Sequence, residues 1–129
     1  LLHIADASAA RLKAENIQKI GLLGTRFTME QDFYRQRLAE HGIESLIPDA
    51  ADRDTTHRVI YDELCLGKVE PESRQAYQAI IGKMQQAGAQ AVLLACTEIA
   101  MLISSDDSVL PVFDTTALHI EAALESMLG

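Results

Sequence analysis

The sequence predicts an α/β fold, an open parallel sheet with helices on both faces. Short apolar segments alternate with longer segments whose apolar residues recur at helical spacing. The segment Ala91–Ala95 has almost no polar residue, which is typical of a strand covered on both faces. A chain of 129 residues, 48% of them hydrophobic, is long enough for one domain with a substantial core.

Five apolar segments are predicted to be strands. They are Leu1–Ile4, Ile20–Leu23, Ile43–Ile47, Ala91–Ala95 and Val109–Phe113. Gly24 closes the second of these strands, and Pro48 ends the third. Because Pro111 cannot donate a backbone hydrogen bond, the last strand is expected to begin there or to lie at an edge of the sheet.

Helices are predicted between the strands, since capping residues and glycines mark their ends. They cover Ala7–Glu15, the segment from Thr28 to Glu40, the segment from Asp49 or Ala50 to about Leu66, the segment from Pro71 to a stop at Gly88, Thr97–Ile103 and Thr115–Leu128. Thr28 and Gln31 match a capping box, in which the Gln31 side chain reaches back to the Thr28 backbone. Asp6 and Asp114 are expected to cap the first and last helices.

Charge and hydropathy exclude several classes of partner. The net charge is −8, and residues 48–129 carry all of it, with five basic and thirteen acidic side chains. No basic stripe is present, so we expect no nucleic-acid partner. No apolar run approaches the roughly 20 residues of a membrane span, and the first residues lack the basic region of a signal peptide. We therefore expect no membrane partner and a cytoplasmic location.

Metal sites and disulfides are not expected either. Cys65 and Cys96 match neither a zinc motif nor a Cys-x-x-Cys redox motif. The run of Asp49, Asp52 and Asp54 lacks the glycine and the terminal glutamate of a calcium loop. The four histidines show no catalytic or metal-binding spacing.

Candidate site residues follow the ends of the predicted strands, where parallel α/β sheets bind ligands. The segments in question are Gly24-Thr25, Ala95-Cys96-Thr97 and Asp114-Thr115-Thr116. Cys96 is either a small core residue or a reactive thiol, and its position favours the reactive thiol slightly. A thiol between a strand end and a helix start would feel the positive end of the helix dipole, which favours the thiolate. Thr97 and the neighbouring backbone N–H groups could bind a carboxylate.

Thr25 has two interpretations, and Cys65 has a single, structural one. Thr25 could bind a small anion through its hydroxyl and backbone, or it could serve only the turn and the helix start. Cys65, at a predicted helix end, is expected to lie in the core when its segment is considered alone.

Four segments form a combination that resembles a known family. They are KIGLLGTRFTMEQDFYRQRL, IYDELCLG, AVLLACTEIAMLI and VFDTTALHIEAAL. Together they resemble the C-terminal half of the aspartate/glutamate racemase family, and most closely its broad-specificity bacterial amino-acid racemases. The resemblance runs from Leu1 to Gly129, with Ala95 in place of the glycine that usually precedes the cysteine.

The resemblance implies a flavodoxin-like fold similar to the second domain of a two-domain racemase that uses no cofactor. Residues 17–116 would be that domain. Residues 1–16 would be a strand and a helix left over from the first domain, and residues 117–129 a C-terminal helix that returns to it. Each domain of such a racemase supplies one acid/base group, and the two groups flank the α-carbon of an amino acid. By this resemblance Cys96 is one acid/base, Thr25 and Thr97 bind substrate, and the other acid/base belongs to a missing N-terminal half.

Cys65 marks a departure from the aspartate-specific relatives, where a lysine at this position pairs with the substrate side-chain carboxylate. The resemblance places Cys65 in the substrate pocket, and a neutral group there removes a charge-assisted bond. We therefore expect a substrate that is not strictly aspartate. We also expect the 129-residue chain to be inactive alone, and to associate with itself or with the missing half through apolar surface near Leu1–Ile4 and the last helix.

Two alternative functions stay open at this point. One is a related cysteine-based decarboxylase or cis–trans isomerase. The other is a non-catalytic flavodoxin-like binding domain.

Overall fold

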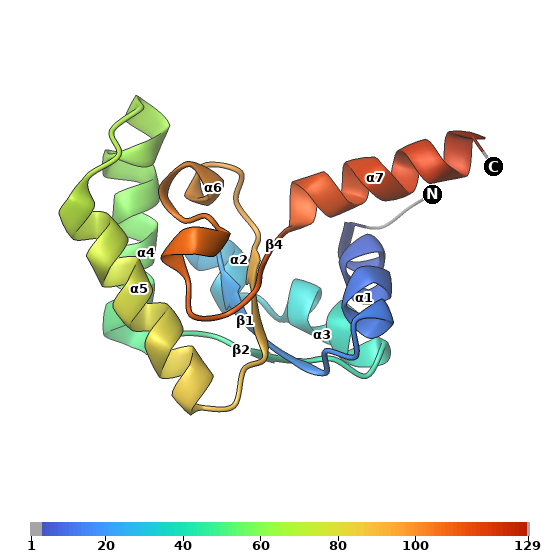
Figure 1. Ribbon diagram of the computed structural model, residues 1–129. Coiled ribbons are helices and arrows are strands. Elements are labelled where there is room, and N and C mark those ends of the chain that lie inside the picture. Colours follow the sequence, from blue (N-terminus) through green and yellow to red (C-terminus); the bar gives the residue numbers. More distant parts are fainter. Residues whose placement is uncertain (1–3, 129) are drawn as a thin grey trace.

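Among the residues that the structure describes, a four-stranded parallel sheet forms the centre of the molecule (Figure 1). The computed structural model describes residues 4–128. The strands are β1 (Lys19–Leu23), β2 (Glu44–Leu46), β3 (Ala91–Leu94) and β4 (Val112–Asp114), in the order β2-β1-β3-β4. The helices are α1 (Ile4–Ala14), α2 (Arg26–Glu30), α3 (Asp32–Glu40), α4 (Ala50–Asp62), α5 (Pro71–Gln86), α6 (Ile99–Leu102) and α7 (Thr115–Leu128), with 3₁₀ turns η1 (Leu64–Leu66) and η2 (Ser105–Asp107).

Side chains that alternate along the central strands divide the core into two clusters, one on each face of the sheet. Leu23, Val92 and Leu94 join buried residues of α4, α5 and α6. Ile20, Leu22 and Leu93 join buried residues of α1, α3 and α7. Figure 1 shows α4 and α5 on one side of the sheet and α1, α3 and α7 on the other. The predicted fold class, a parallel sheet with helices on both faces, is confirmed.

The strand order reverses direction between β1 and β3. From β1 the chain moves outward to β2, and it later returns to place β3 and then β4 on the other side of β1. The backbone N–H of Ala95 donates to the carbonyl oxygen of Leu23 at 2.8 Å, which holds the two strand ends together. A Cβ on Gly24 would lie 3.3 Å from the Thr28 Cβ and 3.4 Å from the Ala95 Cβ, so glycine permits this close approach. Open α/β sheets bind ligands at such a reversal.

The prediction of a strand over Leu1–Ile4 is wrong at Ile4, and residues 1–3 of that segment lie outside the described residues. Ile4 begins α1, which buries Ala5, Ala9 and Leu12 on one side. An alanine-rich segment with apolar residues three and four apart favours a helix, and this spacing outweighs the short apolar run. Asp6 does not cap this helix but lies within its first turn.

The predicted capping box at Thr28 is also wrong. Thr25 is the N-cap of α2, and its Oγ1 accepts a hydrogen bond from the Thr28 N–H at 3.4 Å. The predicted single helix breaks at Gln31, whose φ of −78° and ψ of 141° are extended. Met29 before the break and Tyr34 after it are both buried.

Other predicted boundaries shift by a few residues. The helix expected to reach Leu66 ends at Asp62 and continues as η1, which Gly67 ends with a positive φ of 78°. The helix predicted over Thr97–Ile103 shortens to α6, and the last strand begins after Pro111, at the edge of the sheet. Asp114 caps α7 as expected, because its Oδ1 accepts from the backbone N–H of the second and third helical residues at 2.8 and 3.2 Å. Among residues 4–128, no helix is long and apolar enough to cross a membrane.

Candidate active site

Thr25 and Cys96 lie at the same edge of the sheet, directly beyond the ends of β1 and β3. Parallel pairing puts Leu23 opposite Leu94, so the residues that follow these strands leave the sheet side by side. Asp114 lies opposite Leu94 on the other side of β3. The three predicted strand ends therefore meet at one edge.

Cys96 is half-buried against the core between the sheet and α4 and α5. Its thiol donates a hydrogen bond to Oε2 of Glu98 over 2.9 Å. The Thr97 hydroxyl donates to the same oxygen over 3.0 Å. The segment after β3 thus folds back on itself and brings a thiol, a hydroxyl and a carboxylate together.

These surroundings favour the thiol and not the thiolate, contrary to the expectation from the sequence. The pKa of Cys96 is raised to about 11, first by burial and then by the hydrogen bond to the Glu98 carboxylate and the charges of Glu98 and Cys65, while a hydrogen bond from the Glu98 backbone acts in the opposite direction. The hydrogen bond from Cys96 in turn lowers the pKa of Glu98. The helix that follows, α6, has only four residues. A dipole of that length is weak beside a full negative charge in contact with the sulfur.

Glu98 is the site residue that the sequence interpretation missed. The predicted helix over Thr97–Ile103 includes Glu98, whereas in the structure Glu98 precedes α6 as its N-cap and makes no side-chain cap hydrogen bond. An acidic residue two positions after a strand-end cysteine could have suggested the contact. Sequence does not show which way such a side chain turns.

Tyr77 of α5 belongs to the core cluster against which Cys96 packs. Its side chain is fully buried, and its hydroxyl donates to the backbone carbonyl of Thr56 in α4 over 2.8 Å. Burial, with the negative charge of a Cys96 thiolate, raises the pKa of Tyr77. A neutral phenol therefore lies on the core side of Cys96.

Thr25 has a clear structural role in addition to any role in binding. It is the N-cap of α2, and its hydroxyl lies 3.3 Å from that of Thr28. The N–H of Arg26 donates to Nδ1 of His57 over 2.9 Å, which ties this strand end to α4. The binding roles of Thr25 and Thr97 stay predictions.

Cys65 is exposed, so its expected place in the core is wrong. The neighbouring Leu64 is buried instead, because η1 turns that side chain toward the core. Cys65 nevertheless lies near enough to Cys96 to raise the pKa of the Cys96 thiol. Its role in binding substrate stays a prediction.

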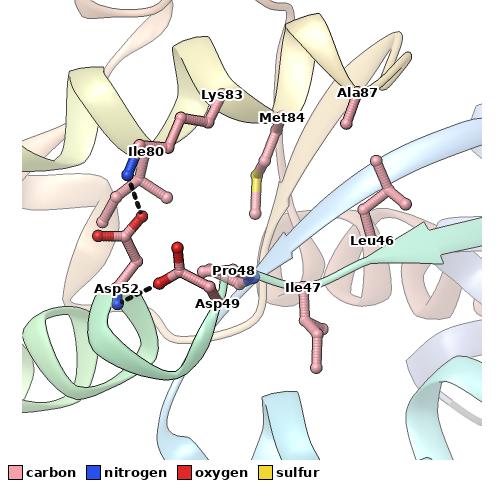
Figure 2. A pocket seen from close by; sticks show the side chains of 9 residues that line it. All are labelled: Leu46, Ile47, Pro48, Asp49, Asp52, Ile80, Lys83, Met84 and Ala87. Atoms are coloured by element: carbon pink, nitrogen blue, oxygen red, sulfur yellow. Dashed lines mark hydrogen bonds and ion pairs between the residues drawn. The ribbon is translucent and has the colours of Figure 1, made fainter.

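A separate pocket of about 210 Å³ opens beyond the end of β2. Its lining is Leu46, Ile47, Pro48, Asp49, Asp52, Ile80, Lys83, Met84 and Ala87. Figure 2 shows Lys83 and Asp52 on one side of it, joined by an ion pair of 2.9 Å, and Leu46 on the other. Asp49 caps α4, so both carboxylates of this pocket already have partners. Within residues 4–128, no group of three or more His, Cys, Asp or Glu side chains could hold a metal ion.

The fold and the site together define a class, an α/β protein that presents a cysteine at the strand-order reversal of a parallel sheet. Comparison with known proteins identifies the family. Residues 1–123 match the family model for Asp/Glu/hydantoin racemases. The chain belongs to this family, and the resemblance inferred from its motifs is confirmed.

Solved structures agree with this assignment. A candidate Asp/Glu racemase from Yersinia pestis is 52% identical, with a TM-score of 0.96 over 100% of this chain and 56% of that one. An aspartate racemase homologue from Pyrococcus horikoshii is 29% identical, with a TM-score of 0.93 over 99% of this chain and 56% of that one. The aspartate racemase of Picrophilus torridus is 27% identical, with a TM-score of 0.69 over 95% of this chain and 52% of that one. The chain thus spans about half the length of these solved relatives.

A curated relative has no described activity. It is an uncharacterised protein encoded in the pnlA 3′ region of Pectobacterium carotovorum subsp. carotovorum, 25% identical over 109 residues, or 82% of this chain and 69% of that protein.

Proposed function

We propose that this chain forms the Cys96-bearing half of an amino-acid racemase that uses two acid/base groups and no cofactor. The observation that carries the proposal is the position of the Cys96 thiol at the reversal point between β1 and β3. Membership of the Asp/Glu/hydantoin racemase family supports it, as do the aspartate racemases among its structural relatives.

Inversion at the α-carbon needs a proton acceptor on one face of the carbon and a proton donor on the other. Cys96 acts on one face. The opposite group belongs to the other half of the protein, outside these 129 residues. Thr97 through its backbone N–H, and Thr25 through its hydroxyl, hold the substrate near the sulfur by hydrogen bonds to its carboxylate, so that the α-carbon lies between the two groups.

The division of the chain follows from this proposal. Residues 17–116 are the domain that carries Cys96, and residues 1–16 and 117–129 contribute to the other half. The apolar residues Ile120, Leu124, Met127 and Leu128 of α7, which are 51–88% exposed, offer a surface for this association.

Cys65 determines the substrate preference in this proposal. An exposed thiol near Cys96 offers no cation for a second substrate carboxylate. The preferred substrate is therefore an amino acid other than strictly aspartate.

The test is α-proton exchange in deuterium oxide, measured by nuclear magnetic resonance with a panel of amino acids. We expect the complete protein encoded by the reading frame to exchange the α-proton, and the isolated 129-residue chain to be inactive. In the complete protein, Cys96→Ala is expected to reduce the rate of inversion at the α-carbon, followed by the optical rotation of the amino acid, by at least about 10²-fold. Asp106→Asn, which removes a charge from an exposed position on η2, serves as the matched control. Inversion at the α-carbon that persists at the unsubstituted rate in Cys96→Ala would contradict the proposal.

The substrate panel separates the related functions. A strong preference for aspartate would contradict the interpretation of Cys65, and Cys65→Lys is expected to shift the preference toward aspartate. Release of carbon dioxide from a malonate-type substrate, or turnover of maleate, would identify a related cysteine-based decarboxylase or isomerase instead.

A further inference from the structure

The Glu98 carboxylate makes a contact with Cys96 that the two-base mechanism does not require. Its Oε2 accepts hydrogen bonds from the Cys96 thiol at 2.9 Å and from the Thr97 hydroxyl at 3.0 Å. Two donors on one oxygen hold the carboxylate in place against the sulfur. The thiol proton therefore has a fixed, negatively charged acceptor.

The other ionisable groups around Cys96 do not offset this charge. Among the described residues, those that act on the thiol are Glu98 from its own segment and Cys65 from η1, and Tyr77 of α5 lies on the core side. All three are acids, and the Tyr77 hydroxyl is committed to the Thr56 carbonyl. Within residues 4–128, a thiolate at this position would face a carboxylate with a backbone N–H of Glu98 but no positively charged side chain to compensate it.

We propose that Glu98 is a positioning residue that keeps Cys96 protonated, so that Cys96 rests as the proton donor of the pair and the opposite group rests as the base. This inference rests on the proposed function. The raised pKa of Cys96 agrees with it.

The proton balance of a turnover follows from this resting state. The opposite group takes the α-proton, the S–H bond of Cys96 breaks, and that proton forms the new C–H bond on the other face of the α-carbon. The thiolate that remains lies beside Glu98 and is a strong base, which suits it to remove the α-proton in the reverse direction. The resting protein thus accepts the enantiomer whose α-hydrogen points away from Cys96.

The test measures the pH dependence of Cys96 alkylation by iodoacetamide in the 129-residue chain, and it needs no racemase activity. Cys65→Ser is the background, so that Cys96 is the thiol that reacts. In this background Glu98→Gln is expected to lower the midpoint of the alkylation profile by about one pH unit or more, because the charged acceptor is gone. Glu98→Asp keeps the charge on a shorter side chain, and its midpoint is expected to lie between that of the background and that of Glu98→Gln.

Asp106→Asn is again the matched control, since it removes one negative charge from an exposed position. Its midpoint is expected to equal that of the background. A midpoint that is unchanged or raised in Glu98→Gln would overturn the proposal.

A second measurement covers the case in which Glu98→Gln does not fold. The ultraviolet absorbance of the thiolate is titrated in the Cys65→Ser chain, folded and in denaturant. The proposal requires a higher midpoint in the folded chain, and an equal or lower one overturns it. Failure of either measurement with α-proton exchange intact would reject the role of Glu98 and leave the racemase proposal standing.

Discussion

The two faces of the sheet differ in how completely this chain covers them. On one face, α4, α5 and α6 pack onto the strands, and Tyr77 and Ile81 of α5 are fully buried. On the other face, α1 and α3 pack onto the strands, but α7 buries only Thr115 and Leu118. Figure 1 shows α7 running outward beside α1 and past the sheet.

The face under α4, α5 and α6 is thus covered by this chain alone, whereas the outer part of α7 leaves apolar surface exposed. The Cys96 segment packs against the complete face, so the chain's own core holds the candidate site in place. The outer part of α7 repeats apolar residues at helical spacing, which is typical of a helix that binds a partner. Three substitutions test how the two faces differ, beginning with the one expected to have the largest effect.

Ile81→Ala is expected to have the largest effect. The side chain is 0% exposed, and its truncation leaves a cavity that the packed helices cannot close. We expect the free energy of unfolding to fall by about 2–5 kcal/mol, measured by urea denaturation. Leu124→Ala, the same kind of truncation at a position 51% exposed, is the matched control on the other face and should change stability by less than about 0.5 kcal/mol. Equal losses at the two positions would show that the faces do not differ.

Asp6→Asn is expected to have a smaller effect that depends on pH. Asp6 of α1 accepts two hydrogen bonds from Arg37 of α3, each 2.9 Å long, and its Oδ1 lies 2.8 Å from Nε2 of His41. Arg37 first, and then His41, hold the pKa of Asp6 well below its usual range. Because the folded protein lowers this pKa, the contribution to stability is present above about pH 4 and is lost as the pH falls below that value.

Thermal unfolding across this pH range checks the Asp6 prediction. Asp6→Asn should lower the melting temperature at neutral pH, and the gap to the unsubstituted chain should narrow below about pH 4. Asp32→Asn removes a carboxylate whose side chain is 70% exposed and is the control, with little effect expected. A gap that stays constant with pH would contradict the role given to Asp6.

Leu124→Lys is expected to have the smallest effect on stability, within about 0.5 kcal/mol, because the position is exposed. Its effect should appear in association instead. A lysine on the apolar side of α7 should weaken binding between this chain and its partner or a second copy, measured by sedimentation velocity. The control is Lys13→Leu at an exposed position of α1, which replaces a charged residue by an apolar one. It tests whether any surface substitution alters sedimentation.

Much of the fold and part of the site could be predicted because the signals are local. The buried strands were recognisable from unbroken apolar runs, and Asp49 and Asp114 cap their helices as residues of that type usually do. Cys96 could be placed at the strand edge because the apolar run of β3 ends just before it. The break at Gln31 could not be predicted, since it depends on how Met29 and Tyr34 reach the core.

By itself, the sequence determined the parallel α/β architecture, the family and the position of the cysteine. Only the tertiary structure decided the charge environment of that cysteine. The position of Cys96 before a helix predicts a thiolate, yet the Glu98 side chain turns back onto the sulfur and favours the thiol. The physical reason is that electrostatic effects depend on separations of a few ångströms and on side-chain direction, which spacing along the chain does not specify.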